Sequence, residues 1–383
     1  MILEEQSKQE KIAAEQENDP NLALLRYAIK ENNANVQGLE EFRPSFRTLK
    51  IIENAIYQVK RDGRRLIVVP EKFKKIVLEQ IHNSSLASHF GVNKCYAALK
   101  TRFFWPKMHN DLKFFIDSCA ECAKWKRPCK NSSVKLQPVD YENRIGCQIS
   151  IDFKGPLPET KITDLYPVKS RFVLLIVDNA SKYVMGIPTA NMTAEATAEA
   201  IITKWVPLFG LCDNIICDNG SGFKSKLFQN ICNRLQIHMN NSTPYNPRSN
   251  GLVEVNNKLL GTMLFSMVGD KTNEWNQYLD FVISGYNSSV HTTTRYSPNF
   301  LVFGRELIQP VDMIFGTENG FCKTKGWNSW DEQMKERVEV RDKALFQAYH
   351  HNRAAQEKNS IKSETTAYAK TLKVGDRCAV SLP

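Results

Sequence analysis

The stretch Ser150–Pro158, "SIDFKGPLP", places one carboxylate, that of Asp152, within an apolar run. Ile149, Ile151 and Phe153 surround it, and the longer segment "CQISIDF" is typical of a β-strand. A carboxylate in such surroundings is costly unless it is paired or bound to a metal. The stretch therefore predicts a strand that carries a functional acid. The residues that lie near this acid would indicate the function of the protein.

An α/β pattern follows this strand along the chain. The strand candidates are "RFVLLIVDNA", "YVMGIPT", "NIICDN" and "QIHMNNST". The helix candidates are "TAEATAEAIITKWVPLFG", with Thr193 as a plausible N-cap, and "SKLFQNICNRL". The predicted order is three strands, a helix, a strand, a helix and a strand, followed by a long helix from Gly251. The predicted fold class of this region is therefore α/β.

Two further acids have positions that suit a shared site. Asp218 ends the strand "NIICDN", and Glu254 begins the long helix after the turn-rich loop "PYNPRSN". The 35 residues between them leave room for a helix, a strand and that loop. Strand ends that open onto loops are where α/β folds place their chemistry. Three carboxylates at one edge of the sheet would suit Mg²⁺ or Mn²⁺. Two such ions can stabilise the attacking oxygen and the leaving oxygen of an in-line phosphoryl displacement.

Each acid also has a plainer explanation when it is considered alone. Asp218 could start an Asx turn, and Glu254 could favour the positive end of its helix. The shared site is favoured by the joint arrangement on this order of elements, by a metal-ligand pattern upstream and by the basic charge of the chain.

The upstream pattern has the ligand types that zinc prefers. His82 and His89 have six residues between them, and Cys119 and Cys122 follow after a gap of 29. A closed His2Cys2 set is a structural zinc site, and here it brackets two amphipathic segments, "NKCYAALKTRF" and "HNDLKFFIDSC". The metal would stabilise a helical unit too small to fold alone. The alternative is a fortuitous CxxC with surface histidines, and Cys129 is expected not to be a ligand.

Composition favours a polyanionic partner. The 383 residues include 51 Lys and Arg against 41 Asp and Glu, a net charge of +10, and 42% are hydrophobic. A basic surface favours nucleic acid. Residues 76–130 carry nine basic and four acidic side chains together with Trp105 and Trp125. This unit suits contact with phosphates, although a solvated helix face explains it nearly as well.

The cellular compartment is predicted from two features. The N-terminus is charged throughout, unlike a signal peptide, and aliphatic runs such as "FVLLIV" are too short to cross a bilayer. We therefore expect an intracellular protein without a membrane partner. Its ten cysteines should then be mostly reduced thiols or metal ligands.

Composition shifts along the chain predict its domain organisation. "IIENAIYQVK" and "RRLIVVP" are expected to form a hairpin around the turn "RDG". In chain order we expect a disordered polar tail over residues 1–20, an N-terminal extension of a helix plus the hairpin over 21–75, the zinc-binding unit over 76–130, a linker over 131–145, the α/β core over 146–315, a helical linker over 316–372, and the start of a truncated C-terminal β module over 373–383.

These motifs together resemble a known family. Asp152, Asp218 and Glu254 resemble the D,D-35-E triad of retroviral and LTR-retrotransposon integrases. The stretch from "HNSSLASHFG" to "CAECAKWK" resembles their HHCC zinc-binding domain, especially the gypsy-type form. "IDFKGPLP", "CDNGSGF", "NPRSNGLVE" and "YNSSVHTTTRYSPNFLVFGR" resemble the integrase core of that group. The resemblance covers roughly residues 55–310, with every motif in the expected order.

The resemblance implies an RNase H-like core in which Asp152, Asp218 and Glu254 are the catalytic residues and hold Mg²⁺ or Mn²⁺. It implies Zn²⁺ on the HHCC set, hydrolysis near a DNA 3′ end, and attack of the freed 3′-hydroxyl on a target strand. Lys258, one turn after Glu254, would meet the DNA backbone. The implied partners are element ends, target DNA and further copies of the chain, in the nucleus after passage through the cytoplasm.

The sequence departs from the family pattern at several positions. Gly222 stands where the family usually carries Glu, and Val255 stands where many members have Arg. Both changes could weaken DNA contacts. The ending "LKVGDRCAVSLP" resembles only the opening of the C-terminal β module. The chain is therefore expected to be a fragment of a mobile element's product or the product of a host gene derived from one.

Three functions remain open at this point. The first is a strand-transfer integrase, and the second is a catalytically silent DNA-binding protein that retains the fold. The third is another RNase H-like nuclease that acts on RNA–DNA hybrids. The intact acids argue against the second, and the zinc unit argues against the third.

Overall fold

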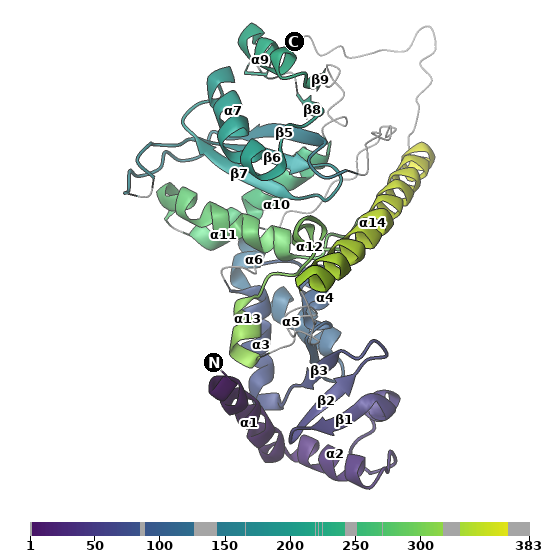
Figure 1. Ribbon diagram of the computed structural model, residues 1–383. Helices are drawn as coiled ribbons and strands as arrows, with labels where there is room; N and C mark the ends of the chain where they lie inside the picture. The colour runs from purple at the N-terminus through teal and green to yellow at the C-terminus, as the bar shows by residue number, and fades with distance from the viewer. Residues whose placement is uncertain are drawn as a thin grey trace, which may run out of the picture.

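Within the residues that it describes, the computed structural model has two sheets at opposite ends of the molecule, with a helical unit between them (Figure 1). The residues that it describes are 2–84, 89–125, 144–164, 166–218, 220, 222–223, 225–241, 251–269, 271–316 and 330–366. Within these ranges the backbone alone is described at 2–8, 123–125, 241, 251–256, 258, 330–334, 360 and 362–366.

The N-terminal part of the chain folds around a small mixed sheet. Strands β1 to β3 are antiparallel neighbours, and β4, from the helical unit, pairs parallel to β3. The bounds are α1 Ile2–Asn18, α2 Pro20–Lys30, the 3-10 helix η1 Arg43–Thr48, β1 Leu49–Ile52, β2 Ala55–Val59, β3 Arg65–Val68 and β4 Phe103–Phe104.

The prediction that residues 1–20 are disordered is wrong, because α1 packs on this sheet. Ile12, Ala13 and Gln16 lie on one face of the helix and are buried. The Gln16 amide donates to the backbone oxygens of Ile56 and Val68, at 3.1 and 2.7 Å, and accepts from the Ile56 N–H at 2.7 Å. These bonds satisfy backbone groups inside the fold, where an unpaired group would be costly. A short buried face within a polar segment is hard to recognise from composition.

The predicted hairpin contains one strand more than expected. Glu53 and Asn54 both adopt positive φ angles, 48° and 64°, and they form a tight turn inside "IIENAIYQVK". Two consecutive positive φ angles are the geometry of a two-residue hairpin turn, which asparagine tolerates well. The segment therefore forms β1 and β2, while the expected turn at "RDG" joins β2 to β3.

The zinc-binding unit begins before the expected boundary at residue 76. Its first helix starts at Glu71, directly after Pro70, a residue common at helix starts, and an acid in the first turn suits the positive end of a helix. The helices of this unit are α3 Glu71–His82, α4 Val92–Leu99, α5 Met108–Asp117 and α6 Ala120–Trp125.

The core has the predicted order of elements. Its sheet runs β7-β6-β5-β8-β9, with β5 antiparallel to β6 and parallel to β8. The α/β prediction for this region is confirmed. The bounds are β5 Gln148–Lys154, β6 Phe172–Asp178, β7 Val184–Thr189, α7 Ala194–Ala200, α8 Val206–Phe209, β8 Asn214–Cys217, α9 Lys226–Arg234, β9 His238–Asn241, α10 Gly251–Val268, the 3-10 helix η3 Thr272–Glu274 and α11 Trp275–Ser288.

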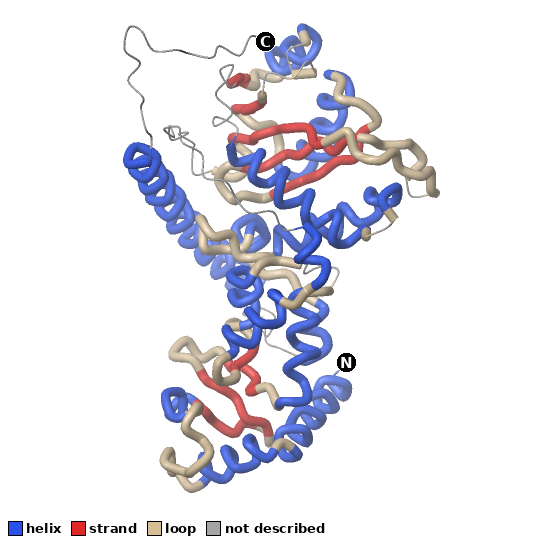
Figure 2. Tube along the Cα trace, turned by 180° about the vertical axis from the view of Figure 1, so that it is seen from behind, coloured by secondary structure: helices blue, strands red, loops and turns tan. Residues whose placement is uncertain are grey.

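Helices cover both faces of the core sheet, as the view from behind shows (Figure 2). Ile149 and Ile151 of β5 pack towards α7 and α9, in a cluster that includes Trp205. Val173 and Leu175 of β6 pack towards α10 and α11. Consecutive residues of these strands are therefore buried, because their side chains point alternately into two separate apolar layers.

One helix of the core is interrupted where the sequence predicts a continuous one. Residues Ile201–Trp205 form a π-helical turn between α7 and α8. Pro207 follows inside α8, and proline cannot donate the backbone hydrogen bond that a regular helix requires. A wider turn before it accommodates the missing donor.

Three helices complete the described chain, and α14 packs against α12. Their bounds are α12 Pro298–Phe303, α13 Pro310–Phe315 and α14 Trp330–Thr366. The expected helical linker over 316–372 is thus helical from 330 to 366, and the predicted β module at 373–383 lies outside the described residues. Among the described helices, none is long and apolar enough to cross a membrane.

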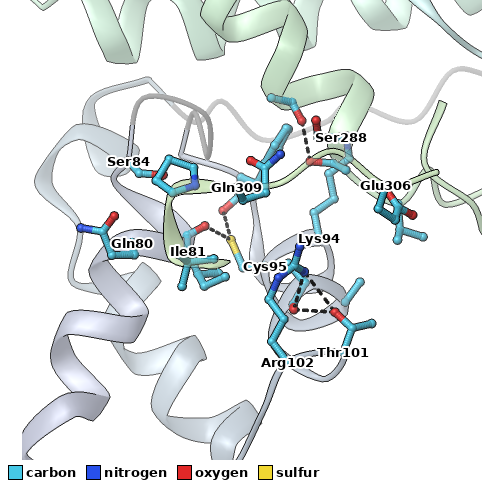
Figure 3. A pocket seen from close by; sticks show the side chains of 18 of the residues that line it. Gln80, Ile81, Ser84, Lys94, Cys95, Thr101, Arg102, Ser288, Glu306 and Gln309 are labelled. Atoms are coloured by element: carbon cyan, nitrogen blue, oxygen red, sulfur yellow. Dashed lines mark hydrogen bonds between the residues drawn. The ribbon is translucent and has the colours of Figure 1, made fainter. Parts of the chain in front are cut away.

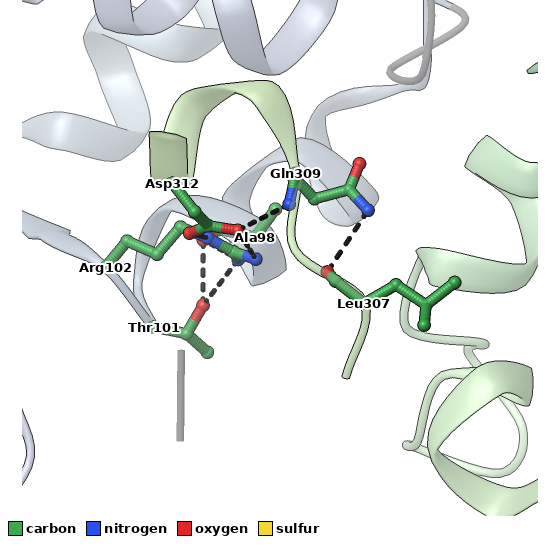
Figure 4. Close-up of polar contacts among 6 residues, drawn as sticks. All are labelled: Ala98, Thr101, Arg102, Leu307, Gln309 and Asp312. Atoms are coloured by element: carbon green, nitrogen blue, oxygen red, sulfur yellow. Dashed lines mark hydrogen bonds and ion pairs between the residues drawn. The ribbon is translucent and has the colours of Figure 1, made fainter. Parts of the chain in front are cut away.

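A buried ion pair joins the zinc-binding unit to the C-terminal part of the core (Figure 4). The Arg102 guanidinium donates to both carboxylate oxygens of Asp312, at 2.6 and 3.1 Å, and also to the Ala98 backbone oxygen and the Thr101 hydroxyl. The side chains of Arg102 and Asp312 are only 9% and 3% exposed. Residues 210 positions apart are therefore held together without competition from solvent.

Removal of one partner of this pair should be strongly destabilising. We expect Arg102→Met to lower the free energy of unfolding by about 3–5 kcal/mol, because the Asp312 carboxylate would remain buried without its cation. Urea denaturation measures the change. The matched control is Lys161→Met, which breaks the exposed ion pair with Glu274 and should cost no more than about 1 kcal/mol. Equal losses in the two variants would contradict the role of the buried pair.

Candidate functional site

The four predicted zinc ligands come together in the structure. One ligand atom from each of His82, His89, Cys119 and Cys122 lies within 4.8 Å of all the others. His82 Nε2 and Cys122 Sγ are 3.4 Å apart, and His89 Nδ1 and Cys119 Sγ are also 3.4 Å apart. A tetrahedral zinc, with bonds of about 2.3 Å to sulfur and about 2.0 Å to nitrogen, places its ligand atoms roughly 3.3–3.8 Å from one another. The four side chains therefore fit one zinc ion.

The local structure also orients the buried histidine. His82 is fully buried, and its Nδ1 lies 3.1 Å from the Phe90 backbone oxygen. In the tautomer that donates from Nδ1 to this oxygen, Nε2 is the nitrogen that faces the cysteines. A hydrogen bond of this kind is typical of metal-bound histidine. The Cys95 thiol donates to the same oxygen at 3.2 Å, and it is not one of the four clustered ligands.

Asp152 and Asp218 lie at the same edge of the core sheet. Asp152 is on β5, and Asp218 directly follows β8, which is its parallel neighbour. The register pairs Ser150 with Ile216, and two further residues along both strands bring the two acids opposite each other. Neighbouring strands are about 4.8 Å apart. Both side chains are half-buried, so this edge presents two carboxylates to a site that solvent reaches.

The helix α10 is tied to this edge by side chains that sequence reasoning missed. The Asn257 amide donates to Asp152 Oδ2, and the Asn257 backbone oxygen accepts from Lys154 Nζ at 3.0 Å. A Cβ added at Gly261 would meet Lys154 Nζ at 2.5 Å, so Lys154 crosses the helix where a side chain is absent. An isolated glycine within an apolar helix was the available signal of this close approach.

Two influences act in opposite directions on the pKa of Lys154. Burial lowers the pKa of Lys154, and the nearby Asp152 carboxylate opposes that change. A lysine that is partly desolvated beside an acid holds its ammonium close to that acid. Lys154 therefore contributes positive charge at the same edge as the two carboxylates.

The loop after Asp218 is fixed by two contacts. The Gly220 N–H donates to Asp218 Oδ1 at 2.8 Å. This is an Asx-type turn, the alternative role that the sequence suggests for Asp218 when it is considered alone. Phe223 is buried and stacks on Phe153, with ring centroids 5.4 Å apart and an interplanar angle of 18°. Asp218 thus both shapes its turn and faces the sheet edge that carries Asp152.

Two predicted site residues have side chains outside the described part of the chain. Glu254 and Lys258 lie on α10, but the structure describes only their backbone. The backbone of Glu254 lies one helical turn before Asn257, whose side chain contacts Asp152. Cys129, which is expected not to be a ligand, lies outside the described residues altogether.

Gly222 has a packing role in this structure. It is the position at which the sequence departs from the Glu expected from the family resemblance. A Cβ at this position would approach the Met192 backbone oxygen to 2.3 Å. We therefore expect Gly222→Ala to lower the free energy of unfolding by about 1–3 kcal/mol, measured by urea denaturation. Because the contact is with backbone, Met192→Ala should not relieve the loss in the double variant. Unchanged stability of Gly222→Ala would contradict this packing role.

Comparison with protein families gives two matches along the chain. Residues 69–128 match the integrase zinc binding domain, which includes the four clustered ligands. Residues 153–247 match the integrase core domain. Asp218 lies within the second match, whereas Asp152 immediately precedes it and Glu254 follows it.

The relatives are polyproteins that are much longer than this chain. The Retrovirus-related Pol polyprotein from transposon 412 of Drosophila melanogaster is 24% identical over 311 residues, which are 80% of this chain and 24% of that protein. The Pro-Pol polyprotein of feline foamy virus is 24% identical over 286 residues, 75% of this chain and 24% of that protein. The chain therefore spans about a quarter of the length of these relatives.

Solved structures also align with parts of the chain. The HTLV-2 integrase catalytic core domain in complex with magnesium is 20% identical, with a TM-score of 0.32, over 40% of this chain and 95% of that one. A simian T-cell lymphotropic virus intasome in complex with a PP2A regulatory subunit is 20% identical, with a TM-score of 0.37, over 64% of this chain and 81% of that one.

Proposed function

Because the chain carries an integrase zinc-binding domain followed by an integrase core domain, and its relatives are Pol polyproteins of retrotransposons and a retrovirus, we propose that it is an LTR-retrotransposon-type DNA integrase. The proposed reaction is metal-dependent processing of a DNA 3′ end followed by strand transfer into a target. The observation that carries the proposal is the parallel pairing of β5 and β8, since it brings Asp152 and Asp218 to one sheet edge.

We infer that Glu254 completes the acid set. Residues three apart in a helix share a face, and Asn257, three residues after Glu254, already contacts Asp152. The same helix face is therefore the part of α10 that lies nearest to the sheet edge. We propose that Glu254 is the acid that this helix face supplies to the site of Asp152 and Asp218.

Three carboxylates are a donor set that fits Mg²⁺ or Mn²⁺. Bound there, the divalent ions would supply charge stabilisation to the attacking and leaving oxygens of the phosphoryl group. The residues of the chain prepare this site. Neutral donors orient the two described carboxylates, with the Asn257 amide on Asp152 and the Gly220 N–H on Asp218. Lys154 adds a positive charge beside them, which favours the approach of a phosphate.

The zinc site is proposed to be structural. Two histidines and two cysteines leave no position open for substrate in a tetrahedral zinc site. In this role the ion would join the C-terminal end of α3 to α6, through ligands at both ends of the unit. That arrangement would stabilise α4 and α5 between them.

DNA is the proposed substrate and partner, and further copies of the chain are the proposed assembly. The basic charge of the chain supports the first of these. Contact of Lys258 with the DNA backbone and a nuclear location remain predictions.

A strand-transfer assay tests the proposed function. Purified full chain is incubated with a labelled duplex and Mg²⁺, and joined products are separated by size. Joined products that require the divalent ion would support the integrase. Binding of the duplex without any joining, under conditions in which a known integrase joins the same DNA, would instead favour the catalytically silent DNA-binding protein.

A further inference from the structure

A cavity of about 350 Å³ lies between the zinc-binding domain and the C-terminal part of the core (Figure 3). Lys94, Cys95 and Arg102, from α4 and the turn after it, line one side of the cavity. Ser288 and Glu306, from α11 and the segment after α12, line the other. Neither the four clustered zinc ligands nor the two core acids are among its lining residues. The cavity is thus distinct from both sites described above, and its volume is within the range of small-molecule sites.

One cation in this cavity lacks an anionic partner. The Lys94 ammonium lies over the ring of Phe90 at 4.4 Å and over the ring of Tyr286 at 4.5 Å. Within the part of the chain that the structure describes, it makes no hydrogen bond or ion pair. Burial lowers the pKa of Lys94 to about 8, so the ammonium form still predominates at neutral pH. A desolvated cation held only by ring faces favours an added anion.

The other charged groups of the cavity already have partners. Both carboxylate oxygens of Asp312 pair with Arg102. The Ser297 hydroxyl donates to Glu306 at 2.7 Å, and burial raises the pKa of Glu306. Arg64, at the rim, bonds with Asp62. Lys94 is therefore the charge that a ligand in this cavity would meet without competition from a neighbouring residue.

The remaining lining suits an amphipathic ligand. The Ser288 hydroxyl accepts from the Asn299 amide at 2.9 Å, which leaves its own hydrogen able to donate to a ligand. Figure 3 shows Ser288 on the core side of the cavity, across from the helix that carries Lys94. Much of the lining surface is apolar, and it is provided by Ile81, Phe90, Ala98, Phe300 and Val311.

We propose that this cavity binds a small organic monoanion, a carboxylate with an apolar body. Its carboxylate contacts the Lys94 ammonium and the Ser288 hydroxyl, and its body packs against the apolar lining. A monoanion is favoured over a phosphate dianion for two reasons. Among the described lining residues, Lys94 is the one cation available to the ligand, and the Glu306 carboxyl lies on the same side of the cavity as Ser288, where it would repel a second negative charge. Since the ligand touches both domains, binding stabilises their docked arrangement.

The test uses 4-phenylbutyrate as the probe on the full chain, with binding measured by isothermal titration calorimetry. We expect Lys94→Met to weaken binding at least about tenfold, because a charge-assisted hydrogen bond is lost. Lys94→Arg should retain most of the affinity. The matched control is Lys100→Met, an exposed lysine at the end of the same helix that lies outside this cavity, and it should bind as the parent does.

Two further probes separate the alternatives. The neutral amide 4-phenylbutanamide should bind at least about tenfold more weakly than the acid, and inorganic phosphate should not compete. If Lys94→Met fails to fold, Ala98→Leu serves instead, because it fills the apolar side of the cavity and should abolish binding. Any one of four results would overturn the proposal. These are no measurable binding, equal affinity for the acid and the amide, full affinity in a folded Lys94→Met variant, and displacement of the probe by phosphate.

Discussion

Asp152→Asn is expected to reduce strand transfer by about a thousandfold. The substitution keeps the size of the side chain and its position on β5, but it removes one negative charge from the proposed metal site. Loss of metal-assisted stabilisation of the phosphoryl transition state amounts to several kcal/mol, which corresponds to a factor of this size. The rate of joined-product formation from a labelled duplex in Mg²⁺ measures the effect.

The control for this variant is the same chemical change outside the site. Asp164 is exposed in the loop between β5 and β6, and Asp164→Asn should leave the rate unchanged within about twofold. DNA binding, followed by fluorescence anisotropy, should be nearly the same in both variants. A rate for Asp152→Asn close to that of the parent would refute the proposed active site. Loss of binding together with rate would indicate a structural role for Asp152 instead.

Cys122→Ser is expected to remove zinc and unfold the zinc-binding domain. A serine hydroxyl does not replace a thiolate as a zinc ligand, and structural zinc contributes about 10–16 kcal/mol of apparent binding energy to small domains. Elemental analysis should find the zinc content reduced from one ion per chain to nearly none. Amide hydrogen exchange should show that α4 and α5 lose their protection.

The matched control is Cys95→Ser, which changes a buried thiol 3.8 Å from His82 Nδ1 that is not one of the four clustered ligands. This variant should keep its zinc. The loss in Cys122→Ser should extend beyond the domain, because one apolar cluster includes Leu112 of α5, Ile67 of β3 and Trp275 of the core. Full zinc content in Cys122→Ser would exclude Cys122 as a ligand, and melting confined to residues 71–125 would contradict the shared core.

The core could be predicted well because its signals are local. Each strand is a short apolar run, and each of the two predicted α/β helices has polar capping residues or periodic apolar positions. The order of these elements, taken together with the upstream zinc-ligand pattern and the basic charge, favoured a site shared by Asp152 and Asp218. The zinc ligands were recognisable for the same reason, since ligand type and spacing are both written in the sequence.

The N-terminal segment shows why other features could not be predicted. The burial of α1 depends on Gln16 meeting unpaired backbone groups of β2 and β3, about 40 and 52 residues away. No local pattern marks a polar side chain for such a role. A polar composition therefore predicted disorder where the structure has a packed helix.

The sequence by itself determined the α/β order of the core, the two pairs of zinc-ligand residues, and Asp152 and Asp218 as acids carried by two strands of that core. Strand and helix periodicity and ligand chemistry depend on residues close together along the chain. Only the tertiary structure decided the contact of Asn257 with Asp152, the pairing of Arg102 with Asp312, and the cavity around Lys94. These features depend on which side chains meet across domains, and that is set by the packing of whole elements, which no single stretch of sequence specifies.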